Sequence, residues 1–583
     1  MTRDMTNKMA LRAATLIGAA TLTLLGACGD GGVGGDCDPE IDGGCVCTLD
    51  ETGQAITDCF GGVDSFGRSC TCSFDGFDPD PFPGEPEGEP EGEPEGNPEG
   101  EPEFVPEVEE RLNFQAPQPS RNYVFVANTG LDTVARIDGD TLAITSIEVG
   151  DAPTVVRTWK EANVAAVLNS GSDDVSIIHA RPEANDVVTL PISRGFNQLV
   201  IAPGGAHALV YLDYRSAEPD SDIGRFQDVN LIRLTEGEEA VYNVAVGFRV
   251  TEIEFDDEGE RAFVVTEDGI SVIEMAGVDG DINAQPIKVT EDPLEDAEAV
   301  DREVEITGDG QLAVVRTSVL QGVNLVPLDR REGLVQVSLP GVPTDLDIYP
   351  DSSRAVAVLK DARQVALLDL SAAIDDPEAL ELIDVPEGPM GLAALDTTSG
   401  VALLYSTASA EPRITRLDLG TGAQVVWDVR KAISGVNLSP DASRAVVFHV
   451  KGDAPRTNAE ADVFIANSFA YTVLDVASGF AKLTTAATEP GEFVFGPDGL
   501  TMFVVLSDKA SGVQQVDRIN LESFRVDAIA LGSPPEHIGL LPSSGAPRIY
   551  VSQEHPVGRM TFIDVDDGEA KTVTGYELNS RVD

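Results

Sequence analysis

Short apolar segments alternate with polar turns along most of the chain, and one phrase recurs ten times between residues 118 and 583. Each copy has an apolar strand, a tight polar turn, a second apolar strand and a third strand that often ends near Asp. The turns fall near residues 120, 160, 205, 258, 309, 351, 397, 441, 498 and 544. Their mean spacing of about 47 residues suits a four-stranded β unit, and repeats of this period stack into arrays or close into rings.

The turn sequences give a physical reason for the short strands. Residues 348–356 and 438–446 are nearly the same phrase, with Pro-Asp followed by Ser, Arg, Ala and Val. Pro presets the first turn dihedral, Asp caps the turn, and Gly or Ser accepts the tight corner. We therefore expect strands after the turns, at Ala206–Leu212, Ala262–Val265, Leu312–Val315, Ala355–Leu359, Ala402–Tyr405, Ala445–Phe448, Met502–Leu506 and Ile549–Val551.

The first repeat carries a family resemblance. Residues 122–128 read Asn-Tyr-Val-Phe-Val-Ala-Asn, and Thr133–Asp138 and the Val-Gly-x-x-Pro of residues 149–153 follow. This resembles the YVTN-type β-propeller repeat, with Ala127 in the place of Thr, and the Pro-Asp hairpins resemble the SPDG hairpins of YVTN and TolB-like propellers. The resemblance implies an all-β fold, a β-propeller of four-stranded blades related to lactonase-like propellers.

About ten repeat units exceed the usual four to eight blades, so the sequence predicts between seven and ten blades. We expect one closed ring. Two smaller rings, or a smaller ring with extra hairpins, are the alternatives. The first and last units each lack a strand unless residues 108–119 or 577–583 supply it, and a strand from one terminus that completed a blade begun at the other would clasp the ring shut.

The N-terminus has the features of an export signal. A basic segment precedes an apolar stretch, Ala13–Leu25, which is too short to span a bilayer and fits a secretory signal peptide. Residues 25–28, Leu-Gly-Ala-Cys, resemble a bacterial lipobox, which implies cleavage after Ala27 and lipidation of Cys28. Gly29 in the next position resembles the pattern that directs lipoproteins to the outer membrane. The alternative is an ordinary signal peptide with a chance Cys.

All seven cysteines lie between residues 28 and 72. After Cys28, the other six fall within 36 residues, too few to form a core without staples, so in an exported chain they predict three disulfides with fifteen pairings. A metal site is the alternative, although the C-x-C spacing differs from the usual C-x2-C. The six are Cys37, Cys45, Cys47, Cys59, Cys70 and Cys72.

Residues 84–103 are five tetrapeptides of Gly-Glu-Pro-Glu type with one Asn replacement. Proline in every fourth place opposes helix and sheet, and mutual repulsion between glutamates favours an extended stalk. The predicted organisation is therefore a signal peptide (1–27), a lipidated Gly-rich tether (28–36), a Cys-rich disulfide module (37–75), a low-complexity linker (76–106) and the propeller (107–583).

The formal net charge is −61, and residues 118–583 hold 75 acidic and 34 basic side chains. Such a surface repels nucleic acids and anionic lipids, so a nucleic-acid partner is excluded. It favours solubility or a cationic partner.

Candidate chemistry is sparse. The five histidines, at positions 179, 207, 449, 537 and 555, have no metal-ligand spacing, and His207 and His449 fall on predicted strands. Asp279–Asn283 resembles the start of a calcium loop, but Thr290 stands where the loop needs Glu. Asp213, Asp220 and Asp222 form a second acidic segment, and Trp427-Asp428 is an isolated WD dipeptide. We expect no catalytic residue and no cofactor, with calcium the only metal left open.

Two functional hypotheses follow. The first is a membrane-anchored binding scaffold at the bacterial cell envelope, with a protein, glycan or cation as partner. The second is an enzyme of lactonase-like or quinoprotein-like type, which the two tryptophans and few histidines disfavour. TolB-like assistance to envelope machinery rests on the hairpins alone. We expect any site where the long loops cluster, namely residues 213–226, 276–284, 290–301 and 450–462.

Overall fold

The computed structural model describes residues 115–576, apart from 217–224, 291–301, 330–332, 378, 397, 409 and 543–544. The lipidation prediction at Cys28 and the disulfide prediction for the six later cysteines lie outside the described residues. So do Asp220, Asp222 and nearly all of the predicted loop 290–301.

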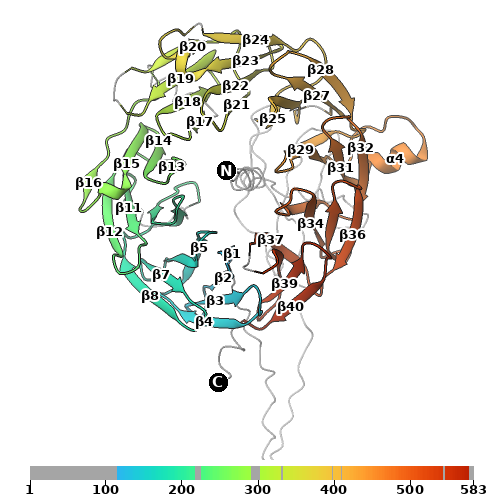
Figure 1. The fold of residues 1–583 in the computed structure, drawn as a ribbon. Coiled ribbons are helices and arrows are strands. Elements are labelled where there is room, and N and C mark those ends of the chain that lie inside the picture. The colour runs from blue at the N-terminus through green and yellow to red at the C-terminus, as the bar shows by residue number, and fades with distance from the viewer. Residues whose placement is uncertain are drawn as a thin grey trace, which may run out of the picture. The chain divides into compact units, whose positions relative to one another are not determined.

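The described strands form ten sheets, which follow one another around a central axis as the blades of a propeller (Figure 1). Blade 1 contains β1 to β4, and the blades are numbered in chain order. The chain runs outward through each blade, from the first strand beside the axis to the fourth strand at the rim. The all-β propeller prediction is confirmed, at the upper end of the predicted range of seven to ten blades.

The first strands of blades 1 to 10 are β1 (Gln118–Pro119), β5 (Pro153–Thr158), β9 (Gln198–Ile201), β13 (Val250–Phe255), β17 (Arg302–Ile306), β21 (Asp345–Ile348), β25 (Leu392–Asp396), β29 (Ile433–Leu438), β33 (Pro490–Phe495) and β37 (Pro535–Leu541). The second strands are β2 (Tyr123–Asn128), β6 (Val164–Asn169), β10 (His207–Tyr211), β14 (Arg261–Thr266), β18 (Leu312–Thr317), β22 (Arg354–Leu359), β26 (Val401–Tyr405), β30 (Arg444–His449), β34 (Thr501–Asp508) and β38 (Arg548–Gln553).

The third strands are β3 (Thr133–Asp138), β7 (Asp174–Ala180), β11 (Asp228–Arg233), β15 (Gly269–Glu274), β19 (Gly322–Pro327), β23 (Gln364–Asp369), β27 (Arg413–Asp418), β31 (Phe469–Asp475), β35 (Val513–Asn520) and β39 (Arg559–Asp564). The fourth strands are β4 (Ile144–Glu148), β8 (Asn185–Pro191), β12 (Ala240–Ala245), β20 (Val335–Ser338), β24 (Leu380–Asp384), β28 (Gln424–Asp428), β32 (Ala481–Ala486), β36 (Arg525–Ala530) and β40 (Ala570–Thr574).

Each of the ten predicted turns joins the first and second strands of a blade, and the eight predicted second strands are all present. Three short helices interrupt the pattern in the described residues, and they are η1 (Met275–Gly277), α3 (Leu370–Ala373) and α4 (Glu460–Ala466).

Blade 4 departs from the four-stranded plan. After β15 the chain crosses to blade 3, where β16 (Ile282–Asn283) pairs in parallel with β12 as a fifth strand. It then returns to make a single bridge between Ile270 and Ile287 at its own rim. The predicted loop 276–284 is therefore a clasp between two blades.

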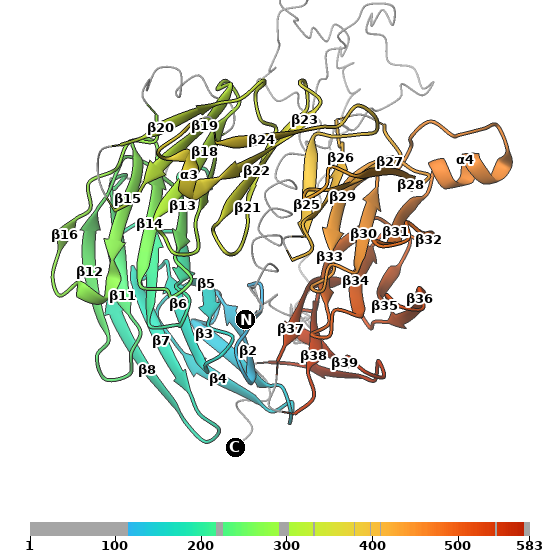
Figure 2. The same cartoon turned by 45° about the horizontal axis from the view of Figure 1, so that its top comes forward.

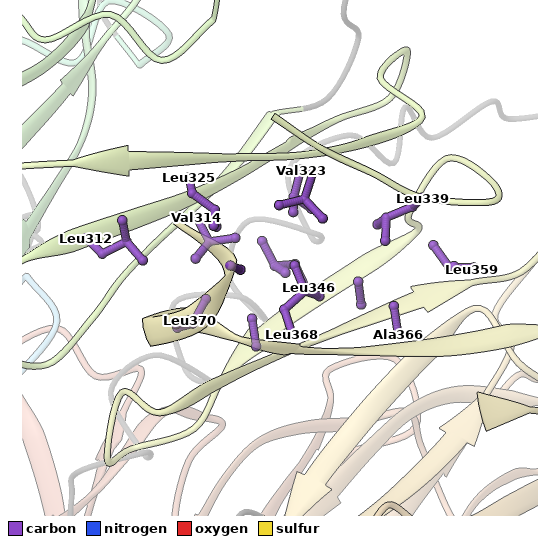
Figure 3. Close-up of a cluster of buried hydrophobic side chains, with 14 residues drawn as sticks. Leu312, Val314, Val323, Leu325, Leu339, Leu346, Leu359, Ala366, Leu368 and Leu370 are labelled. Carbon is purple, nitrogen blue, oxygen red and sulfur yellow. The ribbon is translucent and has the colours of Figure 1, made fainter. Parts of the chain in front are cut away.

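The hydrophobic core lies between blades, in ten clusters that each combine residues of two neighbouring blades. Successive side chains of a strand point to opposite faces of the sheet, so one strand serves two interfaces. In β22, Ala357 packs toward blade 5 while Val356 and Val358 pack toward blade 7. Figure 3 shows the cluster between blades 5 and 6, where Val314 and Leu325 face Leu346 and Leu368.

The ring closes between blades 10 and 1 without strand exchange. Val124 and Ile137 of blade 1 pack with Phe562 and Tyr576 in one buried cluster. The Tyr550 hydroxyl donates to the Pro117 carbonyl at 3.2 Å, and the Arg548 guanidinium donates to the Gly139 carbonyl. β1 supplies the first strand of blade 1 from within residues 108–119, as predicted, and β40 completes blade 10. Each of these strands pairs in the blade of its own terminus, so the described residues contain no strand from one terminus that completes a blade begun at the other.

Candidate binding surface

The direction of the strands gives the ring two different faces. In each blade, the turn between the first and second strands and the turn between the third and fourth lie at one end, which we call the turn face. The loop between the second and third strands and the connector to the next blade lie at the other end, which we call the loop face. Turns of successive blades touch, since the Asp257 amide donates to the Gly308 carbonyl at 2.8 Å and the Gly308 amide to Ser352 Oγ at 2.8 Å.

The turn face repeats the same local bonds from blade to blade. Asp351 Oδ1 accepts the Ser353 amide at 3.0 Å, and Asp498 Oδ1 accepts the Leu500 amide at 2.9 Å. These bonds lower the pKa of Asp351, with the Ser353 hydroxyl as the largest cause. The carboxylates of Asp351 and Asp498 therefore stabilise the turns in which they lie.

The loop face is irregular, and its largest described excursion belongs to blade 8. Between β30 and β31 the chain leaves the sheet, forms α4 and returns, and we call residues 450–468 the blade 8 arm. Figure 2 shows α4 projecting from the ring beside β28 and β32. The arm contains the predicted loop 450–462, and its helix was not predicted from the sequence.

A buried lysine anchors this arm to the ring. Lys431, in the connector from blade 7 to blade 8, is 1% exposed. Its Nζ lies 2.9 Å from Asp453 Oδ1 and 2.7 Å from the Ala466 carbonyl, and so it joins the two ends of the arm. Asp453 Oδ2 also accepts the Ala432 amide at 3.0 Å. Because an unpaired buried charge is costly, these bonds hold the arm in a fixed position.

His449 continues the polar network behind Lys431. Its Nδ1 lies 3.2 Å from the Ala432 carbonyl, which can only accept, so Nδ1 carries the proton. Nε2 lies 2.7 Å from Thr472 Oγ1 and accepts from that hydroxyl. Burial lowers the pKa of His449 to about 4, and the positive charge of Lys431 contributes. The imidazole is therefore neutral at physiological pH.

A pocket of about 240 Å³ lies between α4 and the blade 7–8 connector. Its polar lining includes Arg430, Lys431, Arg456 and Asp453. Arg456 forms an ion pair with Asp428 outside the pocket, and Lys431 pairs with Asp453 inside it, so both of these basic side chains are engaged by carboxylates. This lining fixes the position of the arm more than it selects an ion.

Outside the pocket, the arm presents apolar side chains to solvent. Phe464 on α4 is 63% exposed, Val463 beside it is 39% exposed, and Val450 at the start of the arm is 45% exposed. These are three of the eight large apolar side chains that are exposed in the described part of the chain. A rigid segment carrying exposed apolar groups is a typical interaction element.

The sequence did not single out Lys431, yet it contained a signal. Eight of the nine connectors between blades contain Gly or Pro, and the connector at residues 428–433, Asp-Val-Arg-Lys-Ala-Ile, contains neither. The other connectors use Gly or Pro to turn toward the next blade. This connector instead has two adjacent basic residues between apolar ones, which indicates a role besides turning the chain.

The described parts of two other predicted loops bond to blade 3 and not to the arm. Asp213, in loop 213–226, bonds Asn197 of blade 3, with its amide 2.8 Å from Asn197 Oδ1. Loop 276–284 lies at the rim of blade 3, where Asp281 Oδ1 accepts the Asn243 amide at 3.0 Å. The acidic segment that resembles a calcium loop thus supplies a bond between blades.

The histidines are dispersed among the blades. His179 pairs with Glu239 at 3.0 Å, and His537 pairs with Glu492 at 3.0 Å across blades 10 and 9. His207 begins β10, and His555 follows β38. Trp427 lies on β28, where Gly479 of blade 8 packs against its ring. Within the described ranges, no group of three or more His, Cys, Asp or Glu side chains is arranged to hold a metal ion.

No helix within the described parts of the chain combines the length and the apolar character that crossing a membrane requires.

No family model matches the chain, and no curated protein matches it. Among solved structures, the chain is similar to hydrazine synthase of Kuenenia stuttgartiensis at 13% identity and a TM-score of 0.27, over 56% of this chain and 99% of that one. It is similar to the dihydro-heme d1 dehydrogenase NirN in complex with DHE at 11% identity and a TM-score of 0.39, over 72% and 77% of the two chains. A chain of the mitotic checkpoint complex matches at 11% identity and a TM-score of 0.29, over 46% and 75%. With TM-scores below 0.5, these similarities identify no common activity.

Proposed function

We propose that this chain is a lipid-anchored, exported β-propeller lipoprotein of the bacterial cell envelope that works as a binding scaffold, with the blade 8 arm as its contact element. The observation that carries this proposal is the buried Lys431, which joins both ends of the arm and leaves Phe464 exposed. Burying the Lys431 charge is costly, and the arm that it holds exposes apolar side chains to solvent. A rigid arm of this kind is better explained by binding to a partner than by a need of the fold itself.

The repeat chemistry supports a YVTN/SPDG-type propeller. Tyr123 and Asn128 bound β2 in the first repeat, and Asp351, Asp441 and Asp498 cap the corresponding turns of three blades. Propellers of this kind offer a rigid ring on which single loops vary. The blade 8 arm is such a variation.

The N-terminal sequence supports anchoring. Lipid on Cys28 would attach the chain to the outer membrane, the six later cysteines would staple a small module, and residues 84–103 would act as a spacer. In polyproline geometry, at ~3.1 Å per residue, that spacer reaches roughly 60 Å. The propeller would then lie at a distance from the lipid surface.

The test of anchoring is a Cys28→Ser variant in a bacterial host. We expect the wild type to fractionate with the outer membrane and to incorporate labelled fatty acid, and the variant to lose both properties because several acyl chains are needed for stable attachment. A wild type recovered in the soluble fraction, without label, would contradict the lipoprotein assignment. Sugar-lactone turnover, or a bound chromophore in the purified protein, would contradict the scaffold role.

A further inference from the structure

The exposed apolar side chains of the arm are accompanied by negative charge. Glu460 and Asp462 lie in the first turn of α4, ahead of Val463 and Phe464. Glu460 is exposed, whereas Asp462 accepts from the Thr457 hydroxyl and lines the pocket. The basic side chains of the arm are engaged elsewhere, since Arg456 pairs with Asp428 and Lys451 lies 4.3 Å from the centre of the Phe469 ring. The end of the arm therefore combines an aromatic anchor with an acidic border.

The charge of the whole chain adds to this local pattern. With a net charge of −61, the protein attracts basic surfaces and repels acidic ones at distances beyond a single contact. A second copy of the chain and an anionic lipid surface are both negatively charged, so electrostatic repulsion disfavours either as the partner. Charge complementarity thus favours a basic protein.

Lys431 fixes the arm at both of its ends, so the arm should lose little conformational entropy when it binds a partner. Short helices that present one aromatic residue are typical of anchors that fill a cleft on a partner. Building on the proposed scaffold role, we propose that α4 docks into an apolar cleft bordered by Lys and Arg on a partner protein of the envelope, with Phe464 as the central anchor.

The test uses the full chain in its native host, with the photoreactive residue p-benzoylphenylalanine at position 464. Position 480 supplies the matched control, because Phe480 is also a phenylalanine with a similar exposure of 59%, and it lies in the turn between β31 and β32 on the turn face. Irradiated envelope fragments are analysed by mass spectrometry at ionic strengths of about 0.01 M and 1 M, where the Debye length falls from roughly 30 to 3 Å.

We expect a protein adduct at position 464 that is absent at position 480. Its yield should fall at least about threefold at high salt and in a Glu460→Lys variant, which reverses an exposed charge and leaves the Asp462–Thr457 bond in place. An unchanged melting temperature of that variant shows that the fold is intact.

Three other results would overturn the inference. An adduct with a second copy, or with lipid alone, would assign the arm to self-association or to the membrane. A protein adduct that ignores salt and charge reversal would keep the scaffold role and refute the basic cleft. No adduct at position 464 would refute the basic cleft and the binding role of the arm together.

Discussion

The turn face and the loop face belong to the same ten blades, yet the side-chain bonds that shape their turns and loops span different lengths of chain. On the turn face, Asp351 and Asp498 bond amides two residues further along the chain. On the loop face of blade 8, Lys431 bonds Asp453 and Ala466, which are 22 and 35 residues away. The local bonds recur wherever the turn phrase is copied, whereas the bonds of Lys431 join the two ends of one arm and mark the place where blade 8 differs from the repeat.

The largest effect should come from Lys431→Met, which leaves Asp453 without its cation. We expect the free energy of unfolding of the arm region to fall by about 3–5 kcal/mol, because the carboxylate stays largely buried. Thermal melting, combined with thermolysin cleavage mapped to residues 450–468, measures it.

Lys509→Met is the control for this variant. Lys509 pairs with Glu554 on the same face, but it is 72% exposed, and exposed pairs contribute only about 0–1 kcal/mol. Equal melting curves for the two variants would show that Lys431 does not anchor the arm.

Acid should affect the two faces at different pH values. The pKa of His449 is lowered to about 4 in the folded protein, from 6.5, so its stabilising effect is complete above pH 6.5 and is lost as the pH falls toward 4. The shift corresponds to about 3 kcal/mol. Asp351 has a lowered pKa, so its contribution is present above its ordinary pKa of 3.8 and is lost only at more acid pH.

Melting temperatures of the wild type and of His449→Gln, measured from pH 7.5 to 4, test this order. We expect the wild type to lose stability below pH 6.5, and the variant, which has no imidazole to protonate, to be less stable at neutral pH and flatter with pH. Parallel profiles would exclude His449 as the acid-sensitive group.

Alanine substitutions at two glycines on the turn face can distinguish the energetic cost of local backbone strain from that of a clash between blades. Gly259 and Gly499 share a φ of +68°, but a Cβ on Gly259 would lie 1.9 Å from the Pro203 carbonyl oxygen of blade 3, and one on Gly499 would lie 3.5 Å from Pro440. We expect Gly499→Ala to cost about 1 kcal/mol from the left-handed conformation alone. Gly259→Ala should cost about 2 kcal/mol more, because backbone must move. Equal decreases in the free energy of unfolding of the two variants, measured by chemical denaturation, would mean that the turns of neighbouring blades are not in close contact.

The smallest effect should follow Phe464→Ser. The side chain is mostly exposed, so the free energy of unfolding should change by less than about 0.5 kcal/mol. Leu346→Ala, in the buried cluster between blades 5 and 6, should cost about 2–5 kcal/mol in the same denaturation experiment. A large loss for Phe464→Ser would make the residue part of the core and remove it as a binding anchor.

The same contrast explains what the sequence could predict. Pro440, Asp441 and Ser443 specify a turn by chemistry within four residues, and such local signals predict all ten turns and eight of the strands that follow them. The pairing of β16 with β12 was missed, because it depends on which blade lies beside the excursion after β15. α4 and the burial of Lys431 were missed for a similar reason, since their partners are distant in sequence and the local pattern around them is weak.

Apart from β16, which the excursion after β15 adds to blade 3, every blade is one continuous stretch of chain, and the described ends of the ring meet through side chains around Tyr550, Tyr576 and Val124. Closure of the ring therefore does not require that any particular blade come first or last in the sequence. Circular permutants opened at another connector, with a linker joining residues 576 and 115, should form the same ring. Gene duplication could likewise add a whole blade without unpairing an existing strand, which offers a simple route from smaller propellers to one of this size.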